Sequence, residues 1–124
     1  MTARLMVMLA GIFSLLGVGF GAVGAHALKT RLTPDMLAIY RTAVEYQFWH
    51  ALALIAVGLL ALVRPGPLLA AAAWCFTLGL LLFSGSLYAL VLSGMRGLGA
   101  VTPFGGLLLL AAWALLATHA VRTM

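Results

Sequence analysis

Charged residues are scarce in this 124-residue sequence, and their scarcity excludes most water-soluble folds. Only 7% of the residues are charged, whereas 65% are hydrophobic and the mean hydropathy is +1.21. Soluble domains carry roughly 25% charged residues. Acidic side chains are rarest, since only Asp35 and Glu45 stand against seven lysines and arginines. We therefore predict an integral membrane protein with a single domain over residues 1–124.

The lone cysteine and the scattered basic residues exclude further classes. Cys75 has no second cysteine to pair with, so no disulfide forms within the chain. A net charge of +5 suggests nucleic acid in a soluble protein, but no basic run is interleaved with aromatic residues here. We predict no nucleic-acid partner. The basic side chains lie at the ends of apolar segments, which fits contact with anionic lipid headgroups.

Four apolar segments are each close to the roughly 20 residues that cross a hydrocarbon core. They cover residues 5–28, 46–63, 68–92 and 103–121. Backbone groups in lipid need partners within the protein, and no strand-like alternation is present, so helices are predicted. The first segment is too long for the apolar part of a secretion signal, and we expect it to be a retained span. The predicted fold is all-α, an integral membrane bundle of four transmembrane helices.

Turn signals place the helix boundaries. Thr33, Pro34 and Asp35 have the chemistry of a helix start, with a capping hydroxyl, a proline and an acid. No breaker follows before Pro65, so one helix is predicted from residue 34 to residue 63, with residues 34–45 as an amphipathic lead-in to the membrane. Thr102 and the proline after it repeat the cap signal for the fourth span.

Most polar residues fall at one end of these spans. The motifs are Gly24-Ala25-His26-Ala27-Leu28, Glu45-Tyr46-Gln47-Phe48-Trp49-His50, Phe83-Ser84-Gly85-Ser86-Leu87-Tyr88 and Thr102-Pro103-Phe104-Gly105-Gly106. If the spans alternate in direction, all four motifs lie on one side of the membrane. We predict a polar pocket or a helix-tying network there, lined by His26, Gln47, His50, Ser84, Ser86, Tyr88 and Thr102.

The histidines of this network admit three interpretations. His26 ends span one and His50 lies one turn inside span two, so we expect them at similar depth. They serve as a hydrogen-bond tie between helices, as a proton or ligand site, or as metal or haem ligands. No H-x₃-H or C-x₂-C pattern is present, so no metal site and no cofactor are predicted. Ser84 and Ser86 lack a G-x-S-x-G elbow, so no serine hydrolase is predicted.

Two glycine patterns indicate close helix approach. Gly17, Gly21 and Gly24 form one flat stripe at helical spacing, which predicts a packing seam in the bundle, with a homodimer seam or a channel lining as alternatives. Gly105 and Gly106 follow the expected start of the fourth span. They either let this helix pack tightly or leave a bare helix start that docks an anionic group.

The four motifs together resemble the YgdD-like family of small four-span membrane proteins, and the resemblance covers almost the whole chain. It implies the four-span topology and a multi-pass location in a bacterial inner membrane. It implies no activity, because the family is one of unknown function, and no catalytic or cofactor residue is carried over.

Two functional hypotheses follow. The first is a non-enzymatic membrane protein that binds a lipid-like ligand or a partner membrane protein at the polar end, with membrane lipids and a second copy of the chain as further partners. The alternative is proton-coupled or small-solute transport by an oligomer, with His26, His50 and Glu45 as titrating groups. The segment end near Arg64 has no matching polar residues, which disfavours a polar track across the membrane.

Overall fold

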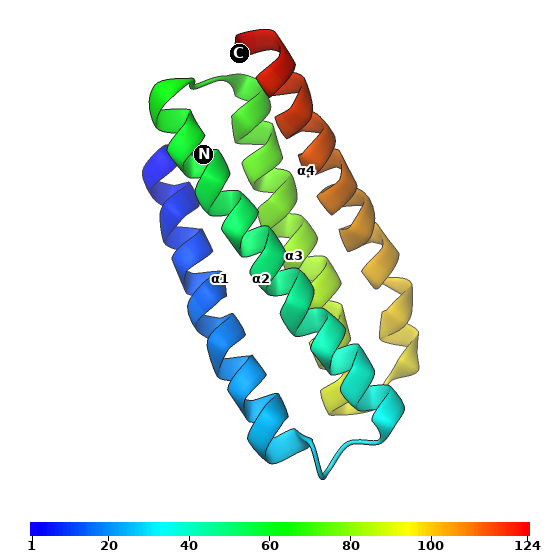
Figure 1. Ribbon diagram of the computed structural model, residues 1–124. Helices are drawn as coiled ribbons and strands as arrows, with labels where there is room; N and C mark the ends of the chain where they lie inside the picture. Colours follow the sequence, from blue (N-terminus) through cyan, green and yellow to red (C-terminus); the bar gives the residue numbers. More distant parts are fainter.

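The computed structural model describes residues 1–124 and contains four long helices and no strand (Figure 1). The helices are α1 (Ala3–Val23), α2 (Pro34–Val63), α3 (Pro67–Ser93) and α4 (Thr102–Thr123), and two short helical segments are η1 (Gly24–Leu28, a π-helix) and η2 (Arg96–Ala100, a 3₁₀-helix). Each long helix is apolar enough and long enough to cross a membrane. The predicted all-α class with four spans is confirmed.

The helices pack in the order of the chain. α1 packs against α2, α2 against α3, and α3 against α4, whereas α1 and α4 share no extensive contact. The central helices α2 and α3 are therefore the most enclosed, with 39% and 44% of their apolar windows buried, against 17% for each outer helix. α1 and α4 therefore present most of their apolar side chains outward. Both termini lie at one end of the bundle (Figure 1).

The start of α2 agrees with its sequence signal. The Thr33 hydroxyl accepts a hydrogen bond from the Met36 N–H at 3.3 Å, and Pro34 occupies the first turn. The helix then runs unbroken to Val63, and Tyr40 is only 3% exposed. Residues 34–45 are therefore continuous with the rest of α2, and the Tyr40 side chain packs inside the bundle.

The predicted Thr102 cap is wrong. Val101 already has helical backbone angles (φ −80°, ψ −33°), because the 3₁₀ segment η2 leads directly into α4. The Phe104 N–H donates to the Val101 carbonyl at 3.1 Å, and no side chain caps this helix start. The Thr102 hydroxyl is thus free to bond a neighbouring helix. At the other end of this connection, Gly94 closes α3 in the left-handed conformation (φ 73°) that favours glycine.

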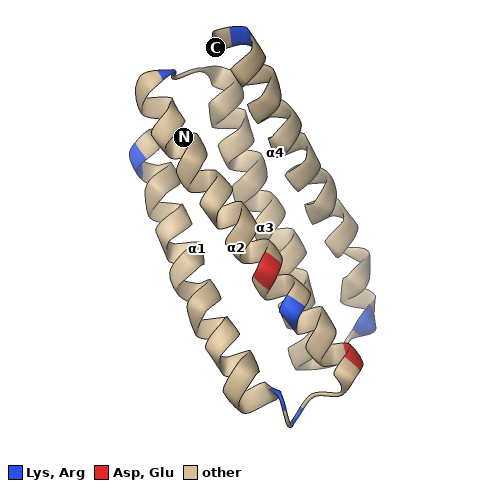
Figure 2. Cartoon of the chain, in the orientation of Figure 1, with Lys and Arg blue, Asp and Glu red and all other residues tan.

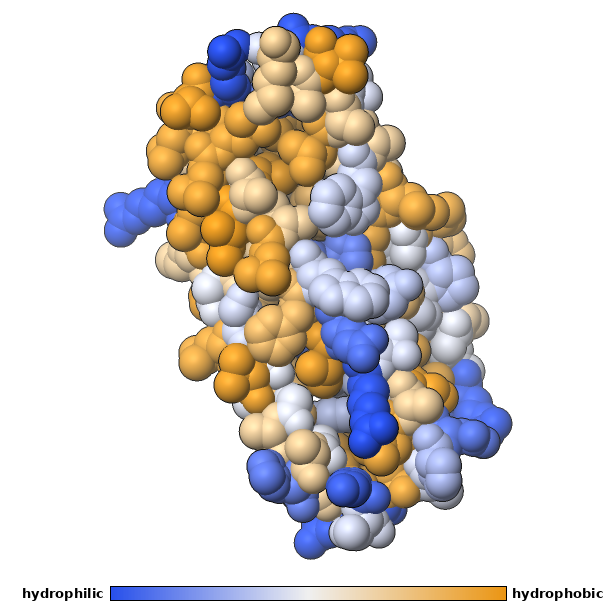
Figure 3. All heavy atoms as spheres, viewed as in Figure 1, coloured by the Kyte–Doolittle hydropathy of each residue, from blue (hydrophilic) through white to orange (hydrophobic).

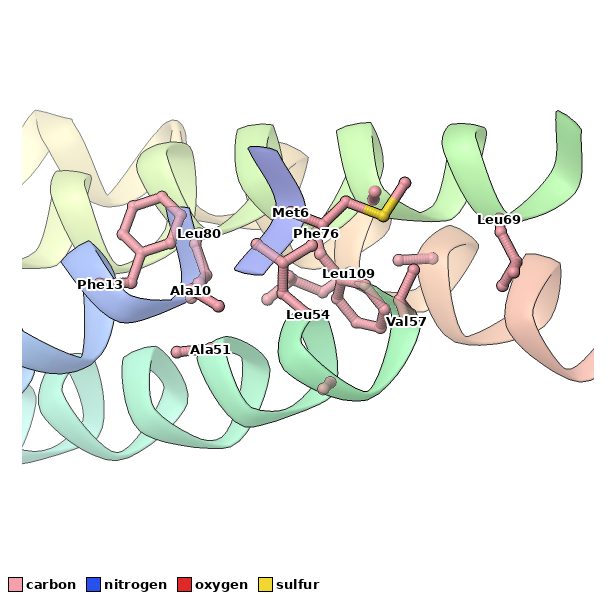
Figure 4. Close-up of a cluster of buried hydrophobic side chains, with 13 residues drawn as sticks. Met6, Ala10, Phe13, Ala51, Leu54, Val57, Leu69, Phe76, Leu80 and Leu109 are labelled. Atoms are coloured by element: carbon pink, nitrogen blue, oxygen red, sulfur yellow. The ribbon is translucent and has the colours of Figure 1, made fainter. Parts of the chain in front are cut away.

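An apolar core fills the half of the bundle near the termini (Figure 4). Its larger buried side chains are Met6, Phe13, Leu54, Val57, Leu69, Phe76, Leu80 and Leu109. The glycine stripe of α1 lies against α2: a Cβ atom on Gly17 would approach the Phe48 ring to 2.9 Å, and one on Gly24 would approach the Tyr40 ring to 2.5 Å. Because Gly17 and Gly24 have no side chain, there is room beside them for aromatic rings of α2 inside the bundle.

The closest helix approach is between α3 and α4. A Cβ atom on Gly105 would lie 2.4 Å from the Phe83 backbone nitrogen and 2.8 Å from its Cα. Backbone atoms cannot rotate away, so these two helices would have to separate. At Gly106, one residue later, the nearest atoms belong to the Phe83 ring at 3.8 Å, which is ordinary contact.

We predict that Gly105→Ala destabilises the bundle by about 1–3 kcal/mol, because the added methyl forces α3 and α4 apart. Gly106→Ala is the matched control and should change stability by no more than about 0.5 kcal/mol. The measurement is thermal unfolding of the purified protein in detergent. Equal losses for the two variants would show that the backbone contact at Phe83 does not limit helix approach.

Candidate functional site

The centre of the polar interior is Gln47 on α2, which is only 4% exposed. Its Nε2 donates to the Phe13 carbonyl of α1 at 2.7 Å. Its Oε1 accepts a hydrogen bond from the Tyr88 hydroxyl of α3 at 2.6 Å. One amide therefore links three helices, and both of its ends have partners, as a buried polar group requires.

Tyr40 forms a second link, between α2 and α1. Its hydroxyl donates to the Phe20 carbonyl. In a regular α-helix the Phe20 carbonyl accepts a hydrogen bond from the Gly24 N–H alone. Here the Gly24 N–H is shared between the Phe20 and Gly21 carbonyls. The wider π-helix η1 begins at Gly24, and a side chain that competes for a helix carbonyl is a known cause of such a distortion. Sequence reasoning missed this role of Tyr40, although Gly24 signals that a bulky ring needs space there.

Two serines join the remaining helices. The Ser84 hydroxyl donates to the Ala43 carbonyl of α2 at 2.8 Å. Ser86 lies 2.6 Å from the Thr102 hydroxyl of α4 and 3.0 Å from the Phe83 carbonyl of its own helix. Neither serine contacts a histidine, so no nucleophile–base pair is present. Five of the seven predicted site residues thus form hydrogen bonds between helices: Gln47, Ser84, Ser86, Tyr88 and Thr102.

The two histidines of the predicted site are not brought together. His26 lies on η1 and is exposed, whereas His50 is 6% exposed near the middle of α2. The expectation of similar depth is wrong, because α2 begins at Pro34 and His50 is therefore about 24 Å along the helix from that end. A third histidine, His119, is 2% exposed and packs beneath Gly66 in the turn between α2 and α3.

His50 borders a groove of about 640 Å³ that lies between α2 and α4, with Phe83 of α3 beside it. The lining residues are Tyr46, Trp49, His50, Phe83, Pro103, Gly106, Leu107, Leu109, Leu110 and Trp113. The aromatic rings contact one another: Tyr46 stacks on Phe83 with centroids 4.4 Å apart, and the His50 ring lies 6.1 Å from that of Trp113. The groove is therefore a mostly apolar, aromatic surface with few polar atoms.

The His50 ring has one free hydrogen-bonding position. Its Nδ1 lies 2.7 Å from the Tyr46 carbonyl, and a carbonyl only accepts, so Nδ1 carries the hydrogen. In the neutral ring, Nε2 is then a lone-pair acceptor, and no group of the chain bonds to it. Ser14 Oγ and His119 Nε2 are the only side-chain polar atoms sealed off without a partner. His50 Nε2 therefore keeps access to the groove that its ring borders.

The site shows no arrangement for metal chemistry. No group of three or more His, Cys, Asp or Glu side chains lies close enough to hold an ion. The chain offers an aromatic groove with one acceptor nitrogen beside a set of satisfied helix ties. That arrangement suits reversible binding of an apolar molecule that carries a hydrogen-bond donor.

Comparison with known proteins places the chain among membrane proteins. Residues 20–106 match the model of a family described as "Protein of unknown function (DUF423)". The UPF0382 inner membrane protein YgdD of Escherichia coli K12 is 38% identical over 98% of this chain and 93% of its own length. The UPF0382 membrane protein YwdK of Bacillus subtilis is also 38% identical, over 96% of this chain and 98% of its own length.

A UPF0382 membrane protein of Staphylococcus haemolyticus is 40% identical over 91% of this chain and 92% of its own length. No solved structure matches the chain. The names of these relatives agree with four apolar helices that cross a membrane, so the chain is a multi-pass membrane protein, and the E. coli relative is an inner-membrane protein. The family has no assigned activity.

We predict that the Gln47 and Tyr88 side chains are energetically coupled. Gln47→Leu and Tyr88→Phe should each cost about 1 kcal/mol of stability, and the double variant should cost less than their sum by about 0.6–1.7 kcal/mol. Unfolding of the four proteins in detergent measures this coupling. Thr118→Ala is the control, because its hydroxyl bonds only within its own helix in an exposed position. Strict additivity would show that the amide–phenol bond contributes nothing.

Proposed function

The chain belongs to the DUF423 family of membrane proteins, and we propose that it binds a membrane-soluble amphipathic molecule in the groove between α2 and α4 without transforming it. The observation that carries this proposal is the unpartnered Nε2 of His50. Every other polar group of the predicted network inside the bundle has a partner within the chain, whereas this nitrogen lacks one beside an aromatic groove. An acceptor that opens onto an apolar groove and has no water beside it gains about 1–2 kcal/mol from a bound donor.

The chemistry of the groove defines the class of ligand. A volume of about 640 Å³ lies within the usual range for small-molecule sites, and the walls are aromatic and aliphatic. The ligand should therefore have a largely apolar body, suited to contact with Trp49 and Trp113, and one hydroxyl or amine donor that reaches His50. Entry is from the side, since Leu107 and Leu110 at the groove edge are 63% and 69% exposed to the lipid region.

The distribution of polar groups favours binding over transport. The half of the bundle near Arg64 is filled mainly by the apolar core, and its buried polar side chains, Thr77 and His119, form no hydrogen bond to the polar interior. The three groups invoked for proton movement also occupy different surroundings: His26 and Glu45 are exposed, and His50 is buried. A proton chain needs neighbouring titratable groups, and these three do not form one.

The test is the recovery of the bound molecule with the protein. Wild type and variants are extracted from native membranes in polymer nanodiscs, and the bound small molecules are identified by mass spectrometry. His50→Phe keeps a ring among aromatic neighbours but removes the acceptor, and it should lower recovery of one amphipathic species about 3- to 20-fold, the value of one hydrogen bond in a membrane. Leu110→Trp should lower the same species by filling the groove from an exposed position.

His26→Ala is the matched control, because it removes an exposed histidine outside the groove. Recovery with this variant should equal that of wild type. If wild type, His50→Phe and Leu110→Trp carry the same molecules in the same amounts, the groove is not a binding site of the proposed kind.

A further inference from the structure

Two charged side chains of opposite sign lie on the exposed side of α2, in the half of the bundle that carries η1. Arg41 and Glu45 are one helical turn apart and both are exposed. They border a cleft of about 230 Å³ between α1 and α2, whose other lining residues are Gly21, Gly24, Ala25, Tyr40 and Val44. Figure 2 shows the acidic and basic positions following one another along α2, and Figure 3 shows a column of hydrophilic residues along this helix.

This cleft lies beside the apolar part of the neighbouring helix. Val44 sits 3.5 Å from the position of a Cβ atom on Gly21, so Glu45 is level with the last part of the first span, about two turns before that span ends at Leu28. Glu45 is also about 16 Å along α2 from Pro34. A charge facing lipid at membrane depth costs about 2.5–3.5 kcal/mol at the centre of a span and less toward its ends, and such residues usually have partners.

Neither charge finds that partner within the chain. No basic and acidic side chains approach within 4.0 Å of each other anywhere in the structure. The order of the two residues is also the weaker one for pairing along a helix, because the basic residue precedes the acidic one by four positions. The carboxylate and the guanidinium are therefore both available to groups outside the chain.

We propose that a second copy of this chain covers the cleft, with Arg41 of each protomer paired to Glu45 of the other. A two-fold axis along the membrane normal places identical surfaces face to face and keeps each residue at the same depth in both copies. The two charges sum to zero and are offset by one turn, about 6 Å, which a long arginine side chain can bridge. This surface is thus complementary to itself, and the reciprocal pairs remove four unpaired charges from the lipid.

The cleft and the ligand groove are different surfaces. The cleft is lined by residues of α1, η1 and α2, whereas the groove is lined mainly by residues of α2 and α4. A test of the dimer is therefore independent of a test of ligand binding at His50.

A charge-swap experiment tests the dimer directly. Cys75→Ala gives a background free of cysteine, and Ala38→Cys then places one thiol on the exposed side of α2 beside Arg41. A short bis-maleimide reagent applied to intact membranes should crosslink this parent into dimers. Arg41→Glu or Glu45→Arg alone puts like charges opposite each other and should lower crosslinking about fivefold or more. The double swap, Arg41→Glu with Glu45→Arg, should restore it to within about twofold of the parent.

Two controls separate this interface from other effects. Asp35→Asn removes the other acidic residue, outside the cleft, and should leave crosslinking unchanged. A thiol at Leu78, an exposed α3 position, should give no crosslink in the same background. The proposal is overturned if the parent does not crosslink, or if the double swap fails to restore what each single swap removes. It is equally overturned if the parent is monomeric and instead carries an amine-headgroup lipid that is lost in Glu45→Gln.

Discussion

The organisation of this protein depends on one constraint: a polar group in hydrocarbon must find its partner within the protein. Lipid tails offer no hydrogen bonds, so an unsatisfied amide or hydroxyl costs several kcal/mol where water is absent. Gln47 meets this constraint with both ends of its amide, toward Phe13 of α1 and Tyr88 of α3. The two hydrogen bonds of the Gln47 amide therefore fix how α1, α2 and α3 are aligned along their axes, and the other contacts of the bundle are consistent with that alignment.

Close approach of the helices follows from the same register. Side-chain hydrogen bonds of 2.7–2.8 Å to a neighbouring backbone, and the 2.6 Å contact between the Ser86 and Thr102 hydroxyls, require helices that come near each other. The glycines provide that proximity, since Gly24 admits the Tyr40 ring whose hydroxyl bonds Phe20, and Gly105 lies against the Phe83 backbone beside the Ser86–Thr102 pair. The glycines and the hydrogen bonds between helices therefore act together. The glycines let two helices approach closely, and the hydroxyl groups then bond across the contact.

The sequence predicts much of the fold and part of the candidate site. Hydropathy and chain breakers identify four spans, and the Thr33 cap is found where it is predicted. The depth of a residue is harder to predict, because hydropathy marks where charged residues end and not which residues pack inside the bundle. The helix start at Pro34 is predicted, but counting span two from residue 46 puts His50 one turn inside it, whereas buried positions begin already at Tyr40 and His50 lies near the middle of α2. The groove beside His50 depends on how α2 and α4 sit across α3, which no local pattern encodes.

The number of polar residues is a poor guide to function in such a bundle. A better guide is which polar groups already have hydrogen-bond partners within the chain. Five side-chain hydrogen bonds join different helices in the polar half, and at about 0.6 kcal/mol each they contribute on the order of 3 kcal/mol to stability. Groups used in this way have no remaining capacity for a ligand. His50 differs from them, because its ring is oriented by Tyr46 yet leaves Nε2 open, and the exposed Arg41 and Glu45 have no ionic partner within the chain. Because the ties between the helices are already satisfied, these three accessible groups are where an external molecule gains most by binding.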